Sequence, residues 1–355
     1  MGQLKFNRQY LIAIQYGEHP TVVQEEKNGK IVDVIKFVEG ENEMVIRPNF
    51  TINLTVDRGI FATMNKISLD IYNLSKETRE NIYYDSVLHA AVHKKIIMYA
   101  GYSDKNFYDY GNNQNEKSAI INRGNIRKSI NGMPLIFFGR FTRAYSYRQG
   151  TNIITHIDAF DLPEKNEVIL STEFKKGTTQ KELFERLAND MKVESKNLKI
   201  SPNFKFVFTR DKSFNDKTTW DVINDIIKSK NDQIQKEEGE NAPLYRMYFD
   251  YPDIVVLRDN EYIETEDIEI SAASGLLNTP IREGAKVKFT SLFEPAFRCG
   301  GSIVLNSRTT QTGINGRLKV VGFKHSGTIS PSICDTLKTE FTCFMGIDKL
   351  VAQNA

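Results

Sequence analysis

The chain has 355 residues, and its 47 basic and 45 acidic side chains give a formal net charge of +2. This balance argues against a dedicated nucleic-acid binder, which needs a concentrated basic face. No stretch approaches the roughly 20 apolar residues of a membrane span. The apolar run at residues 10–14 is too short for a signal-peptide core, which predicts a protein made and assembled in the cytoplasm.

Residues 1–165 are predicted to be mostly β. Residues 11–15 form a short strand, and residues 50–56 alternate apolar with polar side chains, as a strand with one buried face does. The alternation returns at 67–74, after which Ser75 caps a short helix with Glu77 in its first turn. Residues 95–102 are predicted to form a further strand.

The segment 104–132 is rich in Asn and Gly and predicts a long polar loop. Whether this loop is ordered before assembly stays open. Two long strands follow, at 135–147 and 152–161, and residues 148–150 suit the connection of a hairpin.

The hydrophobic period changes between residues 166 and 270. Thr179 with Glu182 predicts a capping box, followed by a helix with one apolar stripe. A second helix follows Thr218 or Thr219, and residues 228–241 are predicted to be a solvated loop. A hairpin is expected at 245–258, turned at Pro252. We interpret this region as a small α+β domain.

Residues 271–355 return to a β pattern. Val287 and Phe289 alternate with polar neighbours, Gly300 and Gly301 turn the chain, and residues 303–305 resume a strand. Residues 317–324 and 337–345 predict a second long hairpin. The three cysteines, Cys299, Cys334 and Cys343, are interpreted as small apolar residues, since their odd number and spacing predict no disulfide framework.

Candidate metal ligands are few. His89 and His93 have the i, i+4 spacing of two ligands on a helix, but Ala90 stands where a zincin needs Glu. The other histidines, His19, His156 and His325, lie far away in sequence. We interpret all five as ordinary structural or surface residues.

Carboxylate groups could supply the acid and base of a glycosidase. The candidates are Glu25 with Glu26, Glu237 with Glu238, and Glu264 with Glu266 and Asp267. Each lies in a polar context that predicts a solvated loop or strand edge, whereas a general acid needs burial to raise its pKa. Gly111, Gly124 and Gly132 fail the spacing of phosphate-binding loops. No catalytic, cofactor-binding or metal-binding residue, and no enzyme activity, is therefore predicted.

The segment 140–148 combines arginine with tyrosine. Strict alternation places Arg143, Tyr145 and Tyr147 on the same face as Phe141. A stacking platform for single-stranded nucleic acid is one interpretation. We favour a protein interface, because aromatic residues and arginine are enriched there.

Several segments together resemble the central baseplate hub proteins of contractile phage tails, which are related to the hub half of type VI secretion spike proteins. They are TINLTVDRGIFATMNKISLDIYNLSKETRENI, IIMYAGY, IFFGRFTRAYSYRQGTNIITHIDAFD, and GLLNTP with the strand that follows it. The resemblance implies a mainly β fold with an α+β insert. Its parts are a tail-tube-like antiparallel β-barrel at 1–165, an α+β domain at 166–270 and a second such barrel at 271–355.

The resemblance also implies a function. Three copies with two barrels each would form a pseudo-sixfold ring that adapts the hexameric tail tube to the trimeric central spike. The implied partners are the tail tube protein, the central spike protein and other baseplate proteins, in the baseplate of a virion. Genomic DNA would pass through the channel without sequence-specific binding. The alternatives are a tail-associated peptidoglycan hydrolase, or a tail tube or distal tail subunit.

Overall fold

The computed structural model describes twelve segments of the chain: 7–27, 30–61, 64–85, 94–102, 129–130, 132–161, 169–191, 193–263, 268–309, 314–331, 336–346 and 349–351. For residues 17–43, 169–172 and 349–351 it describes the backbone alone. Several predicted features lie outside the described residues: His89, His93, Cys334, Gly111, Gly124, the acidic group at 264–267 and most of the 104–132 loop.

The chain divides into two compact units that are interleaved in sequence. Unit 1 comprises Met1–Val56, Lys66–Phe160 and His325–Leu337, and unit 2 comprises Asp57–Asn65, Asp161–Lys324 and Lys338–Ala355. Strands β3 (Ile52–Gly59) and β20 (Gly316–Ile329) contribute residues to both units. The predicted division into three domains, at residues 165 and 270, stays a prediction.

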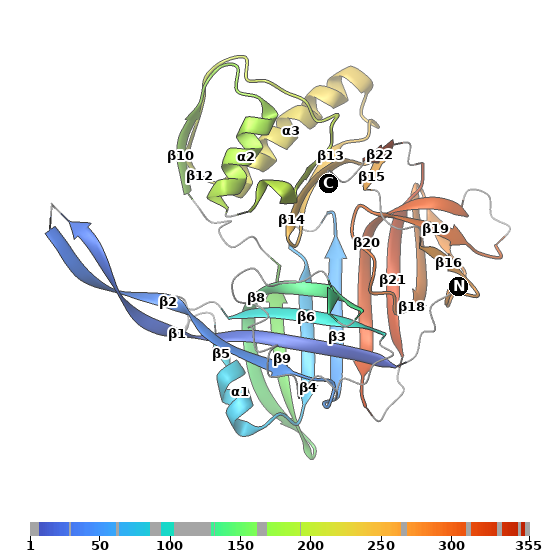
Figure 1. The fold of residues 1–355 in the computed structure, drawn as a ribbon. Coiled ribbons are helices and arrows are strands. Elements are labelled where there is room, and N and C mark those ends of the chain that lie inside the picture. The colour runs from blue at the N-terminus through green and yellow to red at the C-terminus, as the bar shows by residue number, and fades with distance from the viewer. Residues whose placement is uncertain are drawn as a thin grey trace. The chain divides into compact units, whose positions relative to one another are not determined.

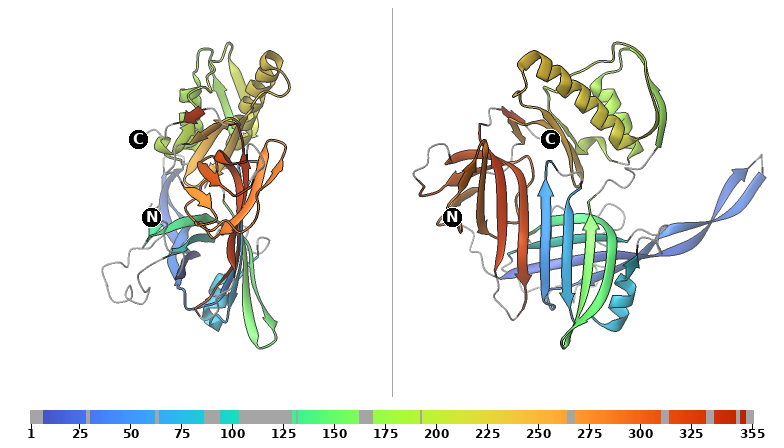
Figure 2. Two further views of the ribbon diagram at one scale, coloured as in Figure 1. Left: turned by 90° about the vertical axis from the view of Figure 1, so that its right-hand side faces the viewer. Right: turned by 180° about the vertical axis from the view of Figure 1, so that it is seen from behind.

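Unit 1 is an antiparallel sheet with one short helix. Within it the strand order is β20-β3-β4-β9-β8-β6-β1-β2, and Figure 2 shows these strands from behind. Its other elements are β1 (Arg8–Lys27), β2 (Lys30–Ile46), β4 (Lys66–Tyr72), α1 (Lys76–Ile82), β5 (Tyr84–Asp85), β6 (Lys95–Tyr102), β7 (Ser129–Ile130), β8 (Met133–Gln149) and β9 (Asn152–Phe160).

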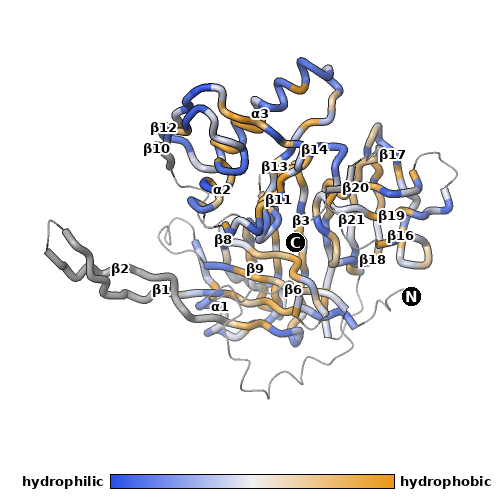
Figure 3. Tube along the Cα trace, turned by 45° about the horizontal axis from the view of Figure 1, so that its top comes forward, coloured by the Kyte–Doolittle hydropathy of each residue, from blue (hydrophilic) through white to orange (hydrophobic). Residues whose placement is uncertain are grey.

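The predicted alternation explains the core of unit 1. Ile52, Leu54 and Val56 of β3 are buried while the residues between them are more exposed. β6 is buried along its whole length, and Figure 3 shows its apolar colouring. The predicted helix after Ser75 is confirmed as α1, with the Ser75 hydroxyl accepting from Thr78 N. The predicted hairpin is confirmed as β8 and β9.

The first hairpin is longer than the sequence predicted. β1 was expected to cover residues 11–15, but it runs for 20 residues and pairs with β2 from Ile12 to Lys27. Only Arg8–Gln15 also pairs with β6, so the outer part of the hairpin leaves the sheet as an arm (Figure 1). Among the described strands, the two strands of this arm pair only with each other beyond Gln15.

Unit 2 contains the α+β region and the strands β17-β18-β21-β20, which form one end of the same hydrogen-bonded sheet. The α+β elements are β10 (Ile169–Phe174), α2 (Gln180–Asp190), a 3₁₀ turn at Ser195–Asn197, β11 (Leu198–Ile200), β12 (Lys212–Thr218), α3 (Thr219–Glu238), β13 (Tyr245–Asp250) and β14 (Asp253–Arg258). The remaining strands are β15 (Glu261–Ile263), β16 (Glu269–Ser271), β17 (Ile281–Glu283), β18 (Lys286–Leu292), β19 (Ser302–Asn306), β21 (Leu337–Phe344) and β22 (Lys349–Val351).

The capping box that the sequence predicted at Thr179 and Glu182 is confirmed at the start of α2. The solvated loop predicted at 228–241 is wrong, because α3 continues to Glu238. Lys, Gln and Glu favour helix there, and buried Ile234 anchors the added turns. Asn231 holds the same stretch by exchanging two hydrogen bonds with the backbone of Tyr245, at 2.9 and 2.8 Å.

The unit 2 strands of this sheet pack on an apolar core that includes Phe289, Phe341 and Cys343. The predicted turn at Gly300 is confirmed: its φ is +79°, and a Cβ there would lie 2.0 Å from the Tyr248 hydroxyl. The molecule is mainly β, as predicted. Within the described residues the strand order is open at β17 and β2, so the two-barrel arrangement stays a prediction.

Candidate interaction face and buried ion pairs

Polar and aromatic side chains gather on one face of the unit 1 strands β4, β9 and β8. We call this set the aromatic-ionic face. Asp70 lies opposite His156, which lies opposite Tyr145, and Asp158 lies opposite Arg143. The face consists of Asp70, Arg143, Tyr145, Tyr147, His156 and Asp158.

A β-bulge in β8 decides which residues reach this face. The register shifts between Phe141 and Arg143, so Thr142 is an extra residue with no residue opposite it on β9, and its hydroxyl donates to the Asp158 carbonyl at 3.1 Å. A bulge inverts the alternation that follows it. Phe141 is therefore buried, whereas Tyr145 and Tyr147 are each 39% exposed. The prediction that these tyrosines share a face with Phe141 is wrong for this reason.

The charged side chains of the face form a connected network. Arg143 Nε donates to Asp158 Oδ2 at 2.7 Å, and His156 Nδ1 lies 2.7 Å from Asp70 Oδ1. His156 Nε2 lies 3.2 Å from Asp158 Oδ2, an ion-pair distance without hydrogen-bond geometry. Burial alone raises the pKa of Asp158, but the hydrogen bonds from Arg143 and Ser68 and the neighbouring His156 outweigh it and hold that pKa below its ordinary value.

Aromatic rings cover this network. The Tyr145 ring lies 5.1 Å from the His156 ring and 6.0 Å from the Tyr147 ring, measured between centroids. The Arg143 guanidinium lies over the Tyr145 ring at 5.7 Å. These contacts fix two exposed tyrosines and an arginine in place, which reduces the entropy lost when a partner binds them.

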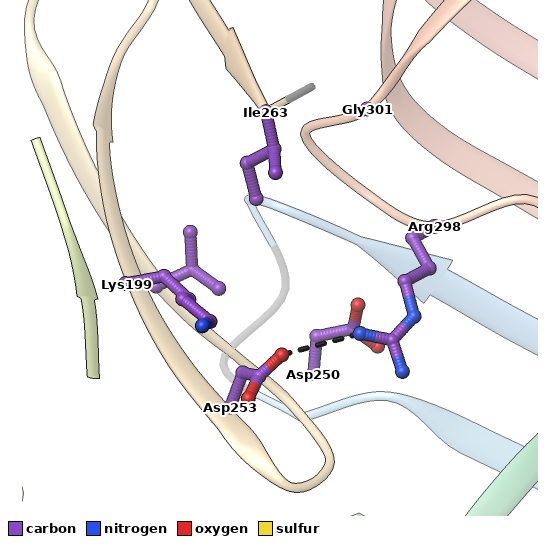
Figure 4. Close-up of a pocket in the computed structure, with 7 residues that line it drawn as sticks. Lys199, Asp250, Asp253, Ile263, Arg298 and Gly301 are labelled. Atoms are coloured by element: carbon purple, nitrogen blue, oxygen red, sulfur yellow. Dashed lines mark hydrogen bonds and ion pairs between the residues drawn. The ribbon is translucent and has the colours of Figure 1, made fainter. Parts of the chain in front are cut away.

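A second charge cluster is buried in unit 2, near the β13–β14 turn. Arg58 bonds to Asp250, and both side chains are nearly inaccessible. Beside them, Arg298 Nη1 donates to Asp253 Oδ2 at 3.2 Å (Figure 4). The cavity between Asp250, Asp253 and Arg298 measures about 10 Å³, which holds roughly one water molecule. It has no room for a sugar ring.

Asn65 and Asp161 extend the buried polar cluster. The Asn65 side-chain amide donates to Asp161 Oδ2 at 2.6 Å and to the Phe249 carbonyl at 3.0 Å. Burial raises the pKa of Asp161, and the Arg58 charge and the hydrogen bonds from Asn65 only partly offset this rise. Burial likewise lowers the pKa of Arg58. These bonds tie the 57–65 segment to the rest of unit 2.

A further buried carboxylate, Glu261, is held by donors on both oxygens. Ser201 and Asn203 donate to Oε1 at 2.9 and 2.7 Å, and Arg258 N donates to Oε2 at 2.9 Å. These buried acids of unit 2 are therefore engaged in structural bonds.

The predicted candidate residues do not converge on one site. Glu237 and Glu238 lie at the exposed end of α3, bonded separately to Gln233 and Arg258. His156 belongs to the aromatic-ionic face and His325 is buried. For His19, Glu25 and Glu26 only the backbone is described.

Cys299 and Cys343 are buried free thiols. Burial raises the pKa of Cys299 to about 12 and raises that of Cys343 also. Among the described residues, no group of three or more His, Cys, Asp or Glu is placed to hold a metal ion. Nor does that part of the chain contain a helix long and apolar enough to cross a membrane.

Residues 31–322 match the family model described as "Baseplate hub gp41". The chain belongs to this family of phage tail baseplate hub proteins. None of the curated proteins matches it.

Solved tail and type VI secretion proteins are similar to this hub-family chain at very low sequence identity. The 43 kDa tail protein of prophage MuSo2 from Shewanella oneidensis is 6% identical, with a TM-score of 0.52 over 95% of this chain and 96% of that one. A tail protein from Neisseria meningitidis is 8% identical, with a TM-score of 0.47 over 94% and 96% of the two chains. The E. coli c3393 protein, a type VI secretion component, is 7% identical, with a TM-score of 0.45 over 83% and 73%. The first of these supports the fold alone.

Proposed function

We propose that this protein is a non-enzymatic hub of a contractile phage tail, or of a tailocin, that forms a homotrimer. Each subunit would give two tail-tube-like barrels to a pseudo-sixfold ring. The ring would join the hexameric tail tube to the trimeric spike, contact other baseplate proteins and line the channel through which DNA passes. The domains would be 1–165, 166–270 and 271–355, with the first and third as the barrels.

The observation that carries this proposal is the aromatic-ionic face in a chain of the baseplate hub family. Exposed, pre-positioned tyrosine and arginine are the side chains that dominate protein interfaces. Their place on the open face of a sheet suits contact with a neighbouring copy in a closed ring.

The β1–β2 arm supports the same proposal. A two-stranded ribbon is marginally stable alone in water, and its outer edges offer unpaired backbone groups. Contact with another subunit would cover them.

Light scattering on the purified protein tests the trimer. Three copies of 40.6 kDa give about 122 kDa, and we expect this mass at micromolar concentration. The double variant Tyr145→Ser, Tyr147→Ser should dissociate to monomers without losing fold, because both side chains are exposed. Lys181→Ser, at an exposed residue of α2 outside both proposed barrels, is the control and should stay trimeric. A stable wild-type monomer would overturn the proposal.

The hydrolase alternative predicts clearing of purified cell walls in a zymogram. We expect none, because the described unit 2 carboxylates Asp250, Asp253 and Glu261 are engaged in structural bonds. The tail tube alternative predicts hexamers or open tubes, and it leaves the α+β region without a role. End-on electron microscopy of the particle separates threefold from sixfold symmetry.

A further inference from the structure

The α+β region of unit 2 carries a groove whose lining the hub function does not explain. It lies between residues 206–214 and helix α3, and its volume is about 310 Å³, at the lower end of the range for ligand sites. We call it the Phe206 groove. All of its residues belong to unit 2, so it is a feature of one compact unit.

The floor of the groove is aromatic. Phe206, Phe208 and Phe214 line it, and the first two are only partly buried. The Phe206 and Phe208 rings pack edge to face at 5.4 Å, and Phe174 bridges Phe208 and Phe214 at 5.9 and 6.0 Å. The rings brace one another, so the floor exposes apolar surface in a fixed shape.

Backbone bonds hold the floor in place. Gly177 N donates to the Phe208 carbonyl at 2.8 Å, and Phe208 N donates to the Thr178 carbonyl at 3.1 Å. The Gln180 side chain accepts from Phe206 N at 2.9 Å. Val207, which stands between Phe206 and Phe208 in the sequence, lines the groove and is 55% exposed. A groove held this way before binding costs little ordering entropy when a partner enters.

Helix α3 forms the wall. Its lining residues repeat at helical spacing, with Asp225, Ser229 and Gln233 in one row and Ile226 and Lys230 in the next. Ser229 offers a hydroxyl to a bound backbone, whereas the Gln233 amide already bonds to Glu237 and Lys230 at 2.7 and 3.4 Å.

The charge of the groove is positive. Arg210, Lys212 and Lys230 line it, and Asp225 is its only carboxylate among the described residues. Asp225 already pairs with Lys217, which reduces its negative field. Lys212 lies over the Phe214 ring at 5.6 Å, so cation and apolar floor are adjacent.

We propose that the Phe206 groove binds an acidic peptide segment of another baseplate protein, extended in shape and carrying an apolar or aromatic side chain. The apolar side chain would enter between the phenylalanines, and the carboxylates would face Arg210, Lys212 and Lys230. A peptide suits the groove better than a nucleic acid, because the Phe206 and Phe208 rings lie at 70° to each other and present no common plane on which successive bases could stack. This inference rests on the proposed baseplate role.

Photo-crosslinking in the assembled particle tests the groove. The full chain carries p-benzoylphenylalanine in place of Val207, and irradiated particles are digested and sequenced by mass spectrometry. We expect a cross-link to a segment of a second baseplate protein in which Asp and Glu outnumber Lys and Arg and an apolar residue is present. Cross-links to DNA, to a basic segment, or to no partner would each overturn the proposal.

Charge reversal supplies the second readout. Arg210→Glu combined with Lys230→Glu should lower the cross-link yield at least tenfold, whereas Lys181→Glu, at an exposed site on α2, should leave it unchanged. Equal yields in both variants would refute the ionic part of the proposal. Particles that assemble with wild-type symmetry but give no cross-link would reject the groove alone, whereas failure to form trimers would reject the hub function.

Discussion

The aromatic-ionic face of unit 1 and the Arg58 cluster of unit 2 use the same chemistry in opposite surroundings. Both join arginine to aspartate, but the Arg143 side chain is 61% exposed and the Arg58 side chain is 8% exposed. Exposed ion pairs contribute about 0–1 kcal/mol, whereas breaking a buried pair costs roughly 3–5 kcal/mol. The exposed Arg143 network is therefore accessible to a partner, whereas the buried Arg58 network stabilises the fold.

The largest expected effect is on the buried network. Arg58→Met should lower the free energy of unfolding by about 3–5 kcal/mol, because Asp250 would remain buried without its cation. Urea denaturation followed by circular dichroism measures it. The double variant Arg58→Met, Asp250→Leu should recover part of the loss. A change below about 1 kcal/mol for the single variant would erase the contrast with the exposed face.

A buried lysine of unit 2 gives the comparison a pH dependence. The Lys319 amine donates to the Arg258 and Asp259 carbonyls at 2.8 and 3.3 Å, and burial lowers its pKa from 10.5 to about 8. Between pH 8 and pH 10.5, Lys319 binds a proton more often in the unfolded chain than in the folded chain. Stability contributed by this group therefore rises from pH 8 to pH 10.5, by up to about 3 kcal/mol.

Lys319→Met should lack that rise. The free energy of unfolding is measured for the wild type and for this variant between pH 7.5 and 10. Subtracting one curve from the other removes the contribution of the thiols and tyrosines, which both proteins share. Parallel curves for the two proteins would contradict the buried charge.

A smaller effect is expected at the capping box of α2. Thr179→Ala removes the hydroxyl that accepts from Glu182 N and should cost about 1 kcal/mol. Thr179→Ser keeps the acceptor and should restore most of the loss. Thermal denaturation of the three proteins measures the order, and an alanine variant as stable as wild type would show that the cap is dispensable.

The smallest stability effect should come from the exposed face itself. Arg143→Met should change the free energy of unfolding by less than about 1 kcal/mol, yet weaken self-association at least tenfold if the face is an interface. Concentration-dependent light scattering beside urea denaturation separates the two quantities. A large loss of stability with unchanged association would reverse the roles given to the two networks.

Local signals in the sequence predicted much of the fold. The alternation around Val287 and Phe289, the β8–β9 hairpin and the Thr179 capping box each depend on residues close in sequence. The resemblance in the first and third regions likewise pointed to the family that the match over residues 31–322 shows.

Long-range features escaped prediction for physical reasons. The Arg58–Asp250 pair joins residues 192 positions apart, which no local pattern reveals. The length of α3 depends on tertiary bonds from Asn231 to Tyr245. The sequence predicted the arginine- and tyrosine-rich segment of the aromatic-ionic face, but it placed these side chains on the same side of the strand as Phe141. The bulge that changes their side depends on pairing with β9, so the sequence of β8 alone does not reveal it.

The extra residue at Thr142 means that the side on which β8 shows a residue cannot be counted from sequence position alone. Deleting Thr142 should leave Phe141 opposite Ala159 and Arg143 opposite Asp158, because regular alternation then joins the two halves of the strand. The aromatic-ionic face should therefore keep its side while the backbone loses its bulge. A one-residue gap at this point in a homologous strand is thus compatible with an unchanged contact surface.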